Sequence, residues 1–281
     1  MPAAYLPERR FVRVSGPDAE PFLQNLITTD LPALAAGEAR PGALLTPQGK
    51  ILFDFTVWRD GDALVLETDV SQQDALLRRL TMYKLRAPVE IALLQDEGTT
   101  VTWGEHADEA GPADLRFTKA GIRLVRRPGP ISVETPVGDY DALRIEAGVA
   151  VSGADFALQD AFPHDVLMDL NCGLSFRKGC YVGQEVVSRM QHRGTARRRL
   201  AIIRSDSDLP ATGTPITAGG KPVGALGTVS GNAALAIVRI DRIGAALAAG
   251  VPLIAGDLPV TASLPDWSGL AFPAGDDEAD A

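Results

Sequence analysis

The chain has 281 residues, of which 46% are hydrophobic and 22% are charged, and its formal net charge is −9. This length suits two or three modules, and the composition is typical of a globular protein. The acidic balance argues against general nucleic-acid binding, and no apolar run reaches the roughly 18 residues that span a bilayer. We therefore expect neither a nucleic acid nor a membrane as a partner.

The N-terminal residues and the cysteines indicate in which cellular compartment the protein is expected. MPAAYLPERRFVRV has no apolar core after a basic start and no small-residue cleavage site, so it does not read as a secretory signal. Cys172 and Cys180 are the only cysteines, too few for a disulfide framework or a tetrahedral zinc site. We expect a cytoplasmic protein with reduced thiols and no metal site.

Helix and strand patterns alternate through the first 195 residues. FVRV and SGPDAEPFLQNLI predict a strand followed by a helix. KILFDFTVWRDGDALVLETD predicts a hairpin, because Asp60-Gly61 suits a tight turn. SQQDALLRRLTMYKLR predicts a helix, and DYDALRIEAG predicts another that ends at Gly148. Two α+β units sharing this region are the expected architecture.

The pattern of the sequence changes after residue 195. Short β-like runs broken by Gly and Pro, such as TPITAGGKPVGALGTVSG, predict a small all-β barrel or sandwich. The chain closes on the acidic AGDDEADA, which lacks apolar anchors and is expected to be disordered. The predicted fold class is therefore α+β, with two interleaved α+β modules in 1–195, a barrel in 196–268 and an acidic tail in 269–281.

Cys180 is the first candidate for chemistry. It lies just before or within the first turn of a helix predicted in VGQEVVSRM, beside Arg177 and Lys178. A helix N-terminus and nearby cations favour the thiolate over the thiol. The alternative is a small buried residue in a tight turn. Cys172 lacks basic neighbours, and a structural role is expected for it.

Two carboxylates are further candidates. Asp54 interrupts the strand ILFDFTVW, where alternation places it on a second, largely apolar face. Partial burial there would raise its pKa, whereas an edge strand would leave it in water. Glu146, near the end of its helix, is either an exposed carboxylate paired with Arg144 or a ligand-binding acid.

The histidines and a cluster of arginines between residues 193 and 199 can each be explained by a structural role. His164 and His192 are 28 residues apart and lack a metal-ligand spacing, so surface or capping roles are expected. The arginines form either a solvated face that joins two modules or a dock for a polyanionic tail. These arginines are Arg193, Arg197, Arg198 and Arg199.

One family resemblance connects these segments. KGCYVGQE resembles the Lys-Gly-Cys-Tyr-x-Gly-Gln-Glu signature of the YgfZ-type folate-binding proteins, and the likeness extends over roughly residues 10–265. It implies a ring of three modules, two α+β units around a folate cleft followed by a barrel. Tetrahydrofolate is the implied cofactor, and its implied contacts are Asp54, Glu146, Lys178, Tyr181, Gln184, Glu185 and Arg193.

The wider superfamily includes the T-protein of glycine cleavage, an aminomethyltransferase that uses tetrahydrofolate. GKILFDF is similar to its Gly-x-Ile-Leu-Asp-Asp segment, so that Asp54 falls on the catalytic aspartate while Phe53 replaces the acid before it. RIEAG is similar to its Leu-Glu-Ala-Gly segment, which places Glu146 at the folate pterin. The T-protein lacks the cysteine of the Gly-Cys-Tyr motif.

The resemblance implies a tetrahydrofolate-binding accessory factor for the assembly or repair of iron–sulfur proteins, mainly of the four-iron kind. Cys180 is then the reactive or partner-facing thiol. The expected partners are client or assembly proteins that bind transiently, and the protein itself is expected to be a monomer. One alternative is an enzyme of C1 transfer, such as an aminomethyltransferase, in which Asp54 steers protonation at a folate nitrogen. Another is a folate-storage protein without turnover.

Overall fold

The computed structural model describes residues 2–104, 111–131 and 137–273, and the statements on structure below concern these residues. The acidic tail expected from residue 269 onward falls mostly in 274–281, which lie outside the described residues. None of the described helices is long and apolar enough to cross a membrane.

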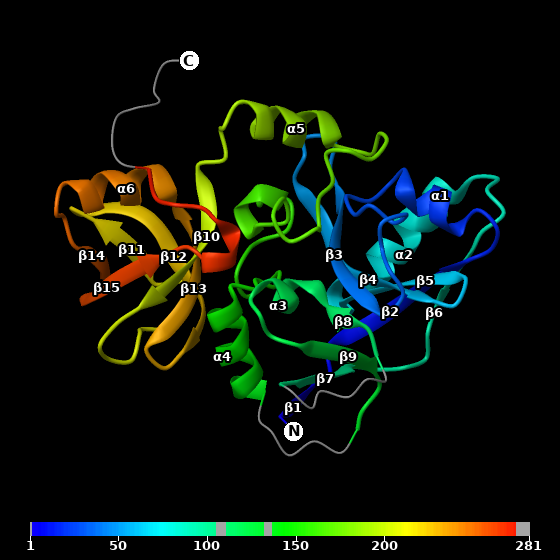
Figure 1. Ribbon diagram of the computed structural model, residues 1–281, viewed down its shortest axis with the longest axis horizontal. Helices are drawn as coiled ribbons and strands as arrows, with labels where there is room; N and C mark the ends of the chain where they lie inside the picture. The colour runs from blue at the N-terminus through cyan, green and yellow to red at the C-terminus, as the bar shows by residue number, and fades with distance from the viewer. Residues whose placement is uncertain (1, 105–110, 132–136, 274–281) are drawn as a thin grey trace.

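The N-terminal two thirds of the chain are built on one nine-stranded sheet (Figure 1). Its strands are antiparallel to their neighbours except for β3 and β8, which run parallel. The two expected α+β units therefore share a single sheet. Across it the strands are β1 (Ala3–Leu6), β7 (Thr99–Trp103), β9 (Leu124–Pro128), β8 (Ala113–Asp114), β3 (Glu38–Leu45), β4 (Ile51–Asp60), β5 (Ala63–Asp69), β2 (Arg9–Ser15) and β6 (Glu90–Leu93).

Local sequence signals set several element boundaries. β4 and β5 form the predicted hairpin, with Gly61 at φ +58° in its turn. The predicted helix end at Gly148 is confirmed by its φ of +65°. The helices are α1 (Ala19–Gln24), α2 (Val70–Lys84), α3 (Leu115–Lys119), α4 (Val137–Ala147), α5 (Gln184–His192) and α6 (Ile240–Ala248), with short 3₁₀ turns at Pro163–Val166 and Asp266–Ser268.

The sheet packs its main core against α1 and α2. Leu76 and Leu80 of α2 are fully buried against strand residues such as Val12 and Leu66. On β4 the odd-numbered residues from Ile51 to Val57 are all buried, as the alternation predicts. Asp54 is left on the other face, where it is half-buried. The hydrophobic pattern of β4 thus decides which way Asp54 points.

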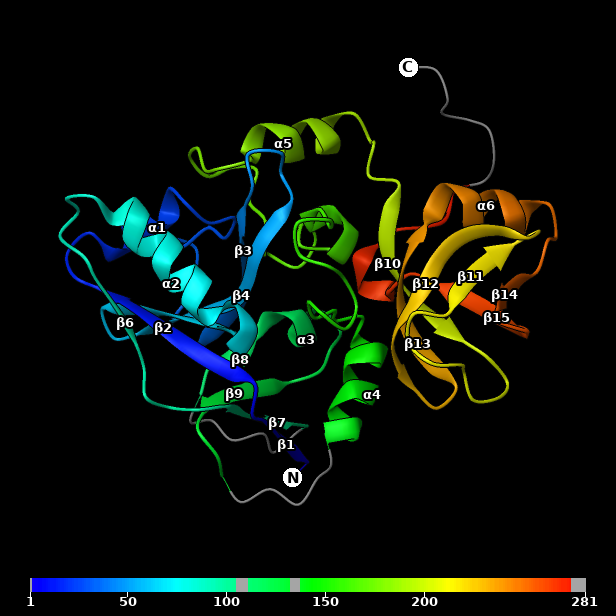
Figure 2. The same cartoon turned by 180° about the vertical axis from the view of Figure 1, so that it is seen from behind.

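The predicted C-terminal barrel is confirmed. Six antiparallel strands close on themselves, because β15 pairs with β10. The barrel lies at one end of the molecule and the large sheet at the other, with α4 and the 148–183 segment between them (Figure 2). Around the barrel the strands are β10 (Arg198–Arg204), β13 (Ala233–Arg239), β12 (Lys221–Ser230), β11 (Pro215–Ala218), β14 (Leu253–Ala255) and β15 (Leu258–Ser263).

Candidate functional site

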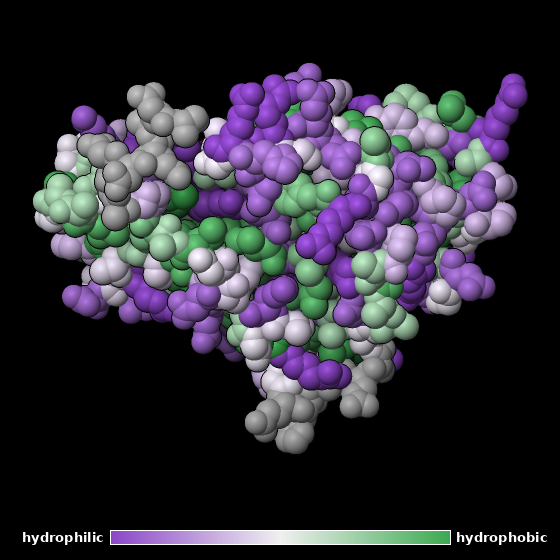
Figure 3. All heavy atoms as spheres, turned by 45° about the horizontal axis from the view of Figure 1, so that its top comes forward, coloured by the Kyte–Doolittle hydropathy of each residue, from purple (hydrophilic) through white to green (hydrophobic). Residues whose placement is uncertain are grey.

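Cys180 lies on an exposed loop that precedes α5. The residue falls four positions before Gln184, the first residue of the helix, and so outside its first turn. Figure 3 brings this side of the molecule forward and shows hydrophilic side chains gathered over α5 and its neighbouring loops. The thiol is therefore accessible from solvent, and the interpretation of Cys180 as a small buried residue does not hold.

Lys178 anchors the loop on one side of the thiol. Its ammonium group donates hydrogen bonds to the carbonyl oxygens of Ile27 and Thr29, each at 2.7 Å, and only 9% of the residue is exposed. Burial lowers the pKa of this amine to about 8, although Asp30 acts in the opposite direction. The cation expected to act on the thiol is thus engaged by the protein backbone.

Tyr181 and Gly183 anchor the loop on the other side. The Tyr181 ring is buried against Val187, and its hydroxyl donates to the carbonyl oxygen of Ser175 at 3.3 Å. Burial raises the pKa of this phenol well above its usual range. Gly183 has φ +79°, and a Cβ atom there would lie 2.5 Å from the carbonyl oxygen of Thr46. Only glycine fits this backbone position.

The other residues predicted around this loop lie on the surface of α5. Gln184 is half-buried at the start of the helix, and its N–H donates to the carbonyl oxygen of Tyr181. Glu185 accepts from Arg189 one helical turn later, in an exposed ion pair. Arg193 is exposed at the C-terminal end. None of these three residues lines the cavity beside Asp54 or the one at the barrel.

The arginine run divides into two parts. Arg198 binds Asp160 and Asp165, and Arg199 binds Asp169 with 2.8 Å between Nη1 and Oδ1. Both arginines therefore tie the start of the barrel to the segment that contains the first 3₁₀ turn. Arg193 and Arg197 remain exposed. Arg198 and Arg199 thus join two modules, as one of the two expectations had it, but Arg199 is buried and not part of a solvated face.

Cys172 and His164 depart from their expected placements. Cys172 is exposed at φ +66°, and not packed in a structural position. His164 is fully buried, so the expectation of a surface or capping role is wrong. Its Nε2 lies 3.3 Å from Oε1 of Gln191 on α5, its ring packs beside Phe176, and its Nδ1 has no hydrogen-bond partner within the described residues. Burial, as the largest influence, lowers its pKa.

Asp54 is bound by two side chains, Gln72 and Ser152, that are not among the predicted site residues. Its Oδ1 accepts hydrogen bonds from Ser152 Oγ at 2.6 Å and from Gln72 Nε2 at 2.8 Å. Its backbone N–H donates to Gln72 Oε1 at 3.1 Å. Gln72 is a buried polar residue in the first turn of α2, and Ser152 follows α4. No local pattern indicates either contact.

The cavity beside Asp54 is small. It has a volume of about 30 Å³, room for a water molecule, and its walls include Phe55, Val149 and Met168. Pockets for small ligands usually measure about 300–1,000 Å³. As it stands, this cavity has no room for the tetrahydrofolate that the sequence resemblance implies, and the Asp54 carboxylate is already bound by Ser152 and Gln72.

Glu146 does not join Asp54 at this cavity. It is exposed on α4 and absent from the cavity lining. The expected pair with Arg144 does not form either, because the buried Arg144 binds Asp155 at 2.9 Å and Asp141 at 2.7 Å. Arg144 also donates to Thr228 Oγ1 on β12 at 2.9 Å, which links α4 to the barrel.

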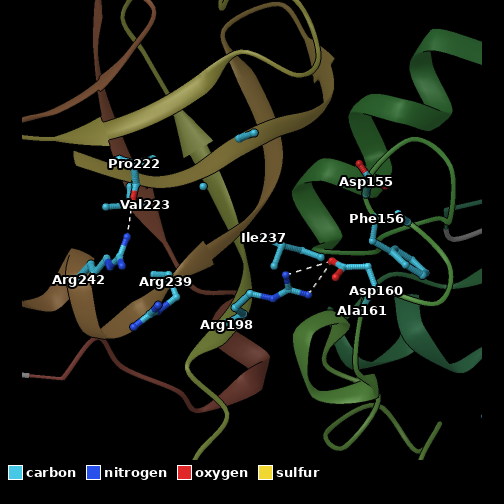
Figure 4. Close-up of a pocket in the computed structure, with 13 residues that line it drawn as sticks. Asp155, Phe156, Asp160, Ala161, Arg198, Pro222, Val223, Ile237, Arg239 and Arg242 are labelled. Carbon is cyan, nitrogen blue, oxygen red and sulfur yellow. Dashed lines mark hydrogen bonds and ion pairs between the residues drawn. The ribbon is translucent and has the colours of Figure 1, made fainter. Parts of the chain in front are cut away.

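A larger cavity of about 470 Å³ separates the barrel from the 155–161 segment (Figure 4). Three arginines line it, and each has an internal acceptor. Arg198 crosses the junction to Asp160, and Arg242 donates to the carbonyl oxygen of Pro222. Arg239 binds Asp241 through two nitrogens. The positive charge of Arg198 and Arg239 is thereby compensated within the protein.

The described residues contain no group of three or more His, Cys, Asp or Glu side chains that could hold a metal ion. A single thiol can supply only one ligand to iron, whereas iron–sulfur clusters are typically held by four. The Cys180 loop offers one exposed thiol, which is too few ligands for a cluster by itself.

Comparison with known proteins agrees with the fold. The family description "CAF17, C-terminal beta-barrel domain" matches residues 197–270. The glycine cleavage system aminomethyltransferase T from Bartonella henselae is similar in structure, with a TM-score of 0.69 over 94% of this chain and 85% of the other. At 16% sequence identity this likeness shows the fold alone. It confirms the predicted α+β architecture with a terminal barrel.

Relatives in sequence carry a more specific name. The human protein "Iron-sulfur cluster assembly factor IBA57, mitochondrial" is 32% identical over 92% of this chain and 83% of its own length. The mouse protein of the same name is 31% identical over the same shares. A homologue from Pyricularia oryzae is 32% identical over 69% of this chain, which spans only 55% of that relative.

The names of these relatives test the expected cellular location and the expected family. They place the relatives in mitochondria, which contradicts the cytoplasmic location expected from the sequence. The missing secretory pattern was a poor ground for that expectation, because it does not distinguish among the other compartments. The YgfZ-type kinship stays a prediction. By its likeness to the human and mouse proteins, the chain belongs to the IBA57 family of iron–sulfur cluster assembly factors.

Proposed function

We propose that this protein assists the assembly of iron–sulfur proteins, mainly of the four-iron kind, through the thiol of Cys180. The observation that carries the proposal is the placement of this thiol between two anchors. Lys178 and Tyr181 are buried on either side of Gly179 and Cys180, which are exposed. The loop thus presents its thiol to a partner while its flanks are bound to the protein.

The chemistry of iron supports a thiolate as the acting group. Cysteine sulfur is the soft ligand that iron–sulfur clusters take in proteins, and four such ligands are usual for a four-iron cluster. The whole chain has two cysteines. A cluster that contacts Cys180 is therefore cargo whose remaining ligands come from a partner protein, and the contact is transient.

Cys180→Ser tests this role, with Cys172→Ser as a matched control because both thiols are exposed. Each variant is expressed in cells that lack the native protein, and the activity of a four-iron enzyme is measured. We expect Cys172→Ser to restore the activity and Cys180→Ser to fail at equal protein level. Full restoration by Cys180→Ser would remove the thiol from the function.

Tetrahydrofolate is not part of this proposal. Folate binding stays a prediction from the resemblance, and the cavity of about 30 Å³ beside Asp54 does not support it. The same holds for the alternative of C1 transfer, which needs a bound folate next to Asp54. Glu146 is exposed and lies outside the lining of that cavity.

A further inference from the structure

The C-terminal end of α2 exposes apolar side chains. Leu85 is 88% exposed and Met82 is 57% exposed. Of the four large apolar residues exposed in the described part of the chain, these are two, and they are three positions apart. We call the surface formed by residues 78–86 the α2 corner.

The α2 corner is also strongly basic. No acidic residue occurs between positions 75 and 89, in a chain whose net charge is −9. Within the described residues no ion pair involves any of its cations, and Arg79 lies over the ring of Tyr83, 5.9 Å from its centroid. The four cations are Arg78, Arg79, Lys84 and Arg86.

Basic and apolar side chains lie close together in the chain at the C-terminal end of α2. Arg78 and Met82 are four residues apart and share one face of α2, and Leu85 follows directly after the last helical residue, Lys84. Leu85 follows the last helical residue at φ +46° and ψ −107°, and a positive φ is unfavourable for leucine. A strained backbone and an exposed apolar side chain thus coincide in one residue. Such coincidences are typical of functional surfaces.

The shape of the α2 corner narrows the choice of partner. In Figure 1 and Figure 2 the segment after α2 lies at the outer edge of the molecule, on the end opposite the barrel. A standard protein interface covers about 800 Å² on each side with complementary shapes. Two protruding apolar side chains offer much less. A lipid surface needs no matching shape and receives apolar tips between its headgroups.

We propose that the α2 corner attaches this protein to membranes rich in anionic phospholipids. Its cations face the headgroups, and Met82 and Leu85 insert at the boundary of the acyl chains. Lys and Arg near such a surface each contribute to binding, and salt screens that contribution. The absence of a membrane partner was expected because no segment spans a bilayer. Attachment to a surface requires no spanning segment.

Vesicle co-sedimentation tests the attachment. The full chain is mixed with vesicles of phosphatidylcholine, with or without 30% phosphatidylglycerol, at 50 and 500 mM salt. We expect binding only to the anionic vesicles and only at low salt. The double variant Arg78→Gln/Arg86→Gln should bind roughly thirtyfold more weakly. Met82→Ser/Leu85→Ser should weaken binding by a similar factor.

Matched controls alter exposed residues elsewhere. Arg123→Gln/Arg204→Gln removes the same charge, and Leu247→Ser removes an apolar side chain that is 50% exposed on α6. Both controls should bind like the unaltered protein. Equal losses in the controls, equal binding to neutral vesicles, or no binding to anionic vesicles would each overturn the proposal. The last outcome, with loss of function in α2-corner variants, would favour an acidic protein partner instead.

Discussion

The ammonium group of Lys178 donates a hydrogen bond to the carbonyl oxygen of Ile27 at 2.7 Å, although 151 residues separate them in the chain. Together with the bond to Thr29, this contact fastens the Cys180 loop to the segment that precedes β3. The position of the thiol thus depends on a contact that does not touch it. Lys178 is a positioning residue for Cys180.

Replacing Lys178 should therefore loosen the loop. Lys178→Gln shortens the side chain and leaves two carbonyl oxygens without their donor, so the free energy of unfolding should fall by about 1–3 kcal/mol. With Cys172 replaced by Ser in both proteins, the reaction of Cys180 with a thiol reagent should change in rate, which a stability loss alone would not produce. Urea denaturation and stopped-flow labelling measure the two effects. Lys221→Gln, at an exposed lysine, should alter neither.

Two glycines beside Cys180 should respond differently to alanine. Gly183→Ala places a methyl group against the carbonyl oxygen of Thr46 at a positive φ, and should cost about 1–2 kcal/mol or more in the free energy of unfolding. Gly179→Ala meets no atom within 4 Å and should be close to neutral. Thermal denaturation of both variants checks the difference. Equal stability of the two would contradict the described loop.

His164 should make the protein sensitive to mild acid. Burial lowers its folded-state pKa below the usual 6.5, so the unfolded chain takes up the proton first as the pH falls. The stability associated with the neutral ring is complete above pH 6.5 and is lost as the pH falls through the lowered pKa. Urea denaturation between pH 7.5 and 5 measures this loss.

Two variants isolate the contribution of His164 from that of other titrating groups. His164→Leu should show a shallower fall in stability below pH 6.5 than the unaltered protein, whatever its stability at pH 7.5. His192→Leu, at an exposed histidine, should follow the curve of the unaltered protein. A fall that is unchanged in His164→Leu would assign the acid sensitivity to other groups.

The small cavity at Asp54 predicts weak or absent folate binding. Titration with 5-formyltetrahydrofolate in a calorimeter should give no binding heat, because about 30 Å³ cannot admit a pterin ring and Asp54 is engaged by Ser152. The ligand should leave the thermal midpoint unchanged. Heat that is seen with the unaltered protein and lost in Asp54→Asn would mean that the cavity opens.

Short-range features of the chain followed from the sequence. The hairpin at Gly61 and the helix end at Gly148 depend on the backbone freedom of single glycines, so neighbouring residues suffice to predict them. The barrel followed from short β-like runs at regular spacing. The Cys180 loop was found because its motif is contiguous. In each case the information lies within a few residues.

Contacts between distant segments were decided by the tertiary structure. The sequence placed Asp54 on the second face of its strand, but Gln72 and Ser152 reach it from 18 and 98 residues away. The engagement of Arg198 and Arg199 by acids of the preceding module is of the same kind. Local patterns carry no signal for such pairs, because chain packing alone brings them within hydrogen-bonding distance.

Cys180 shows most clearly which features the sequence determines and which depend on the tertiary structure. The sequence by itself determined that a cysteine stands beside cations in a specific motif ahead of a helix. Only the tertiary structure decided that the Lys178 ammonium group binds the carbonyl oxygens of Ile27 and Thr29, while Cys180 is exposed to solvent. The physical reason is that a buried ammonium group needs acceptors, and the fold supplies them from a strand entry that is remote in sequence.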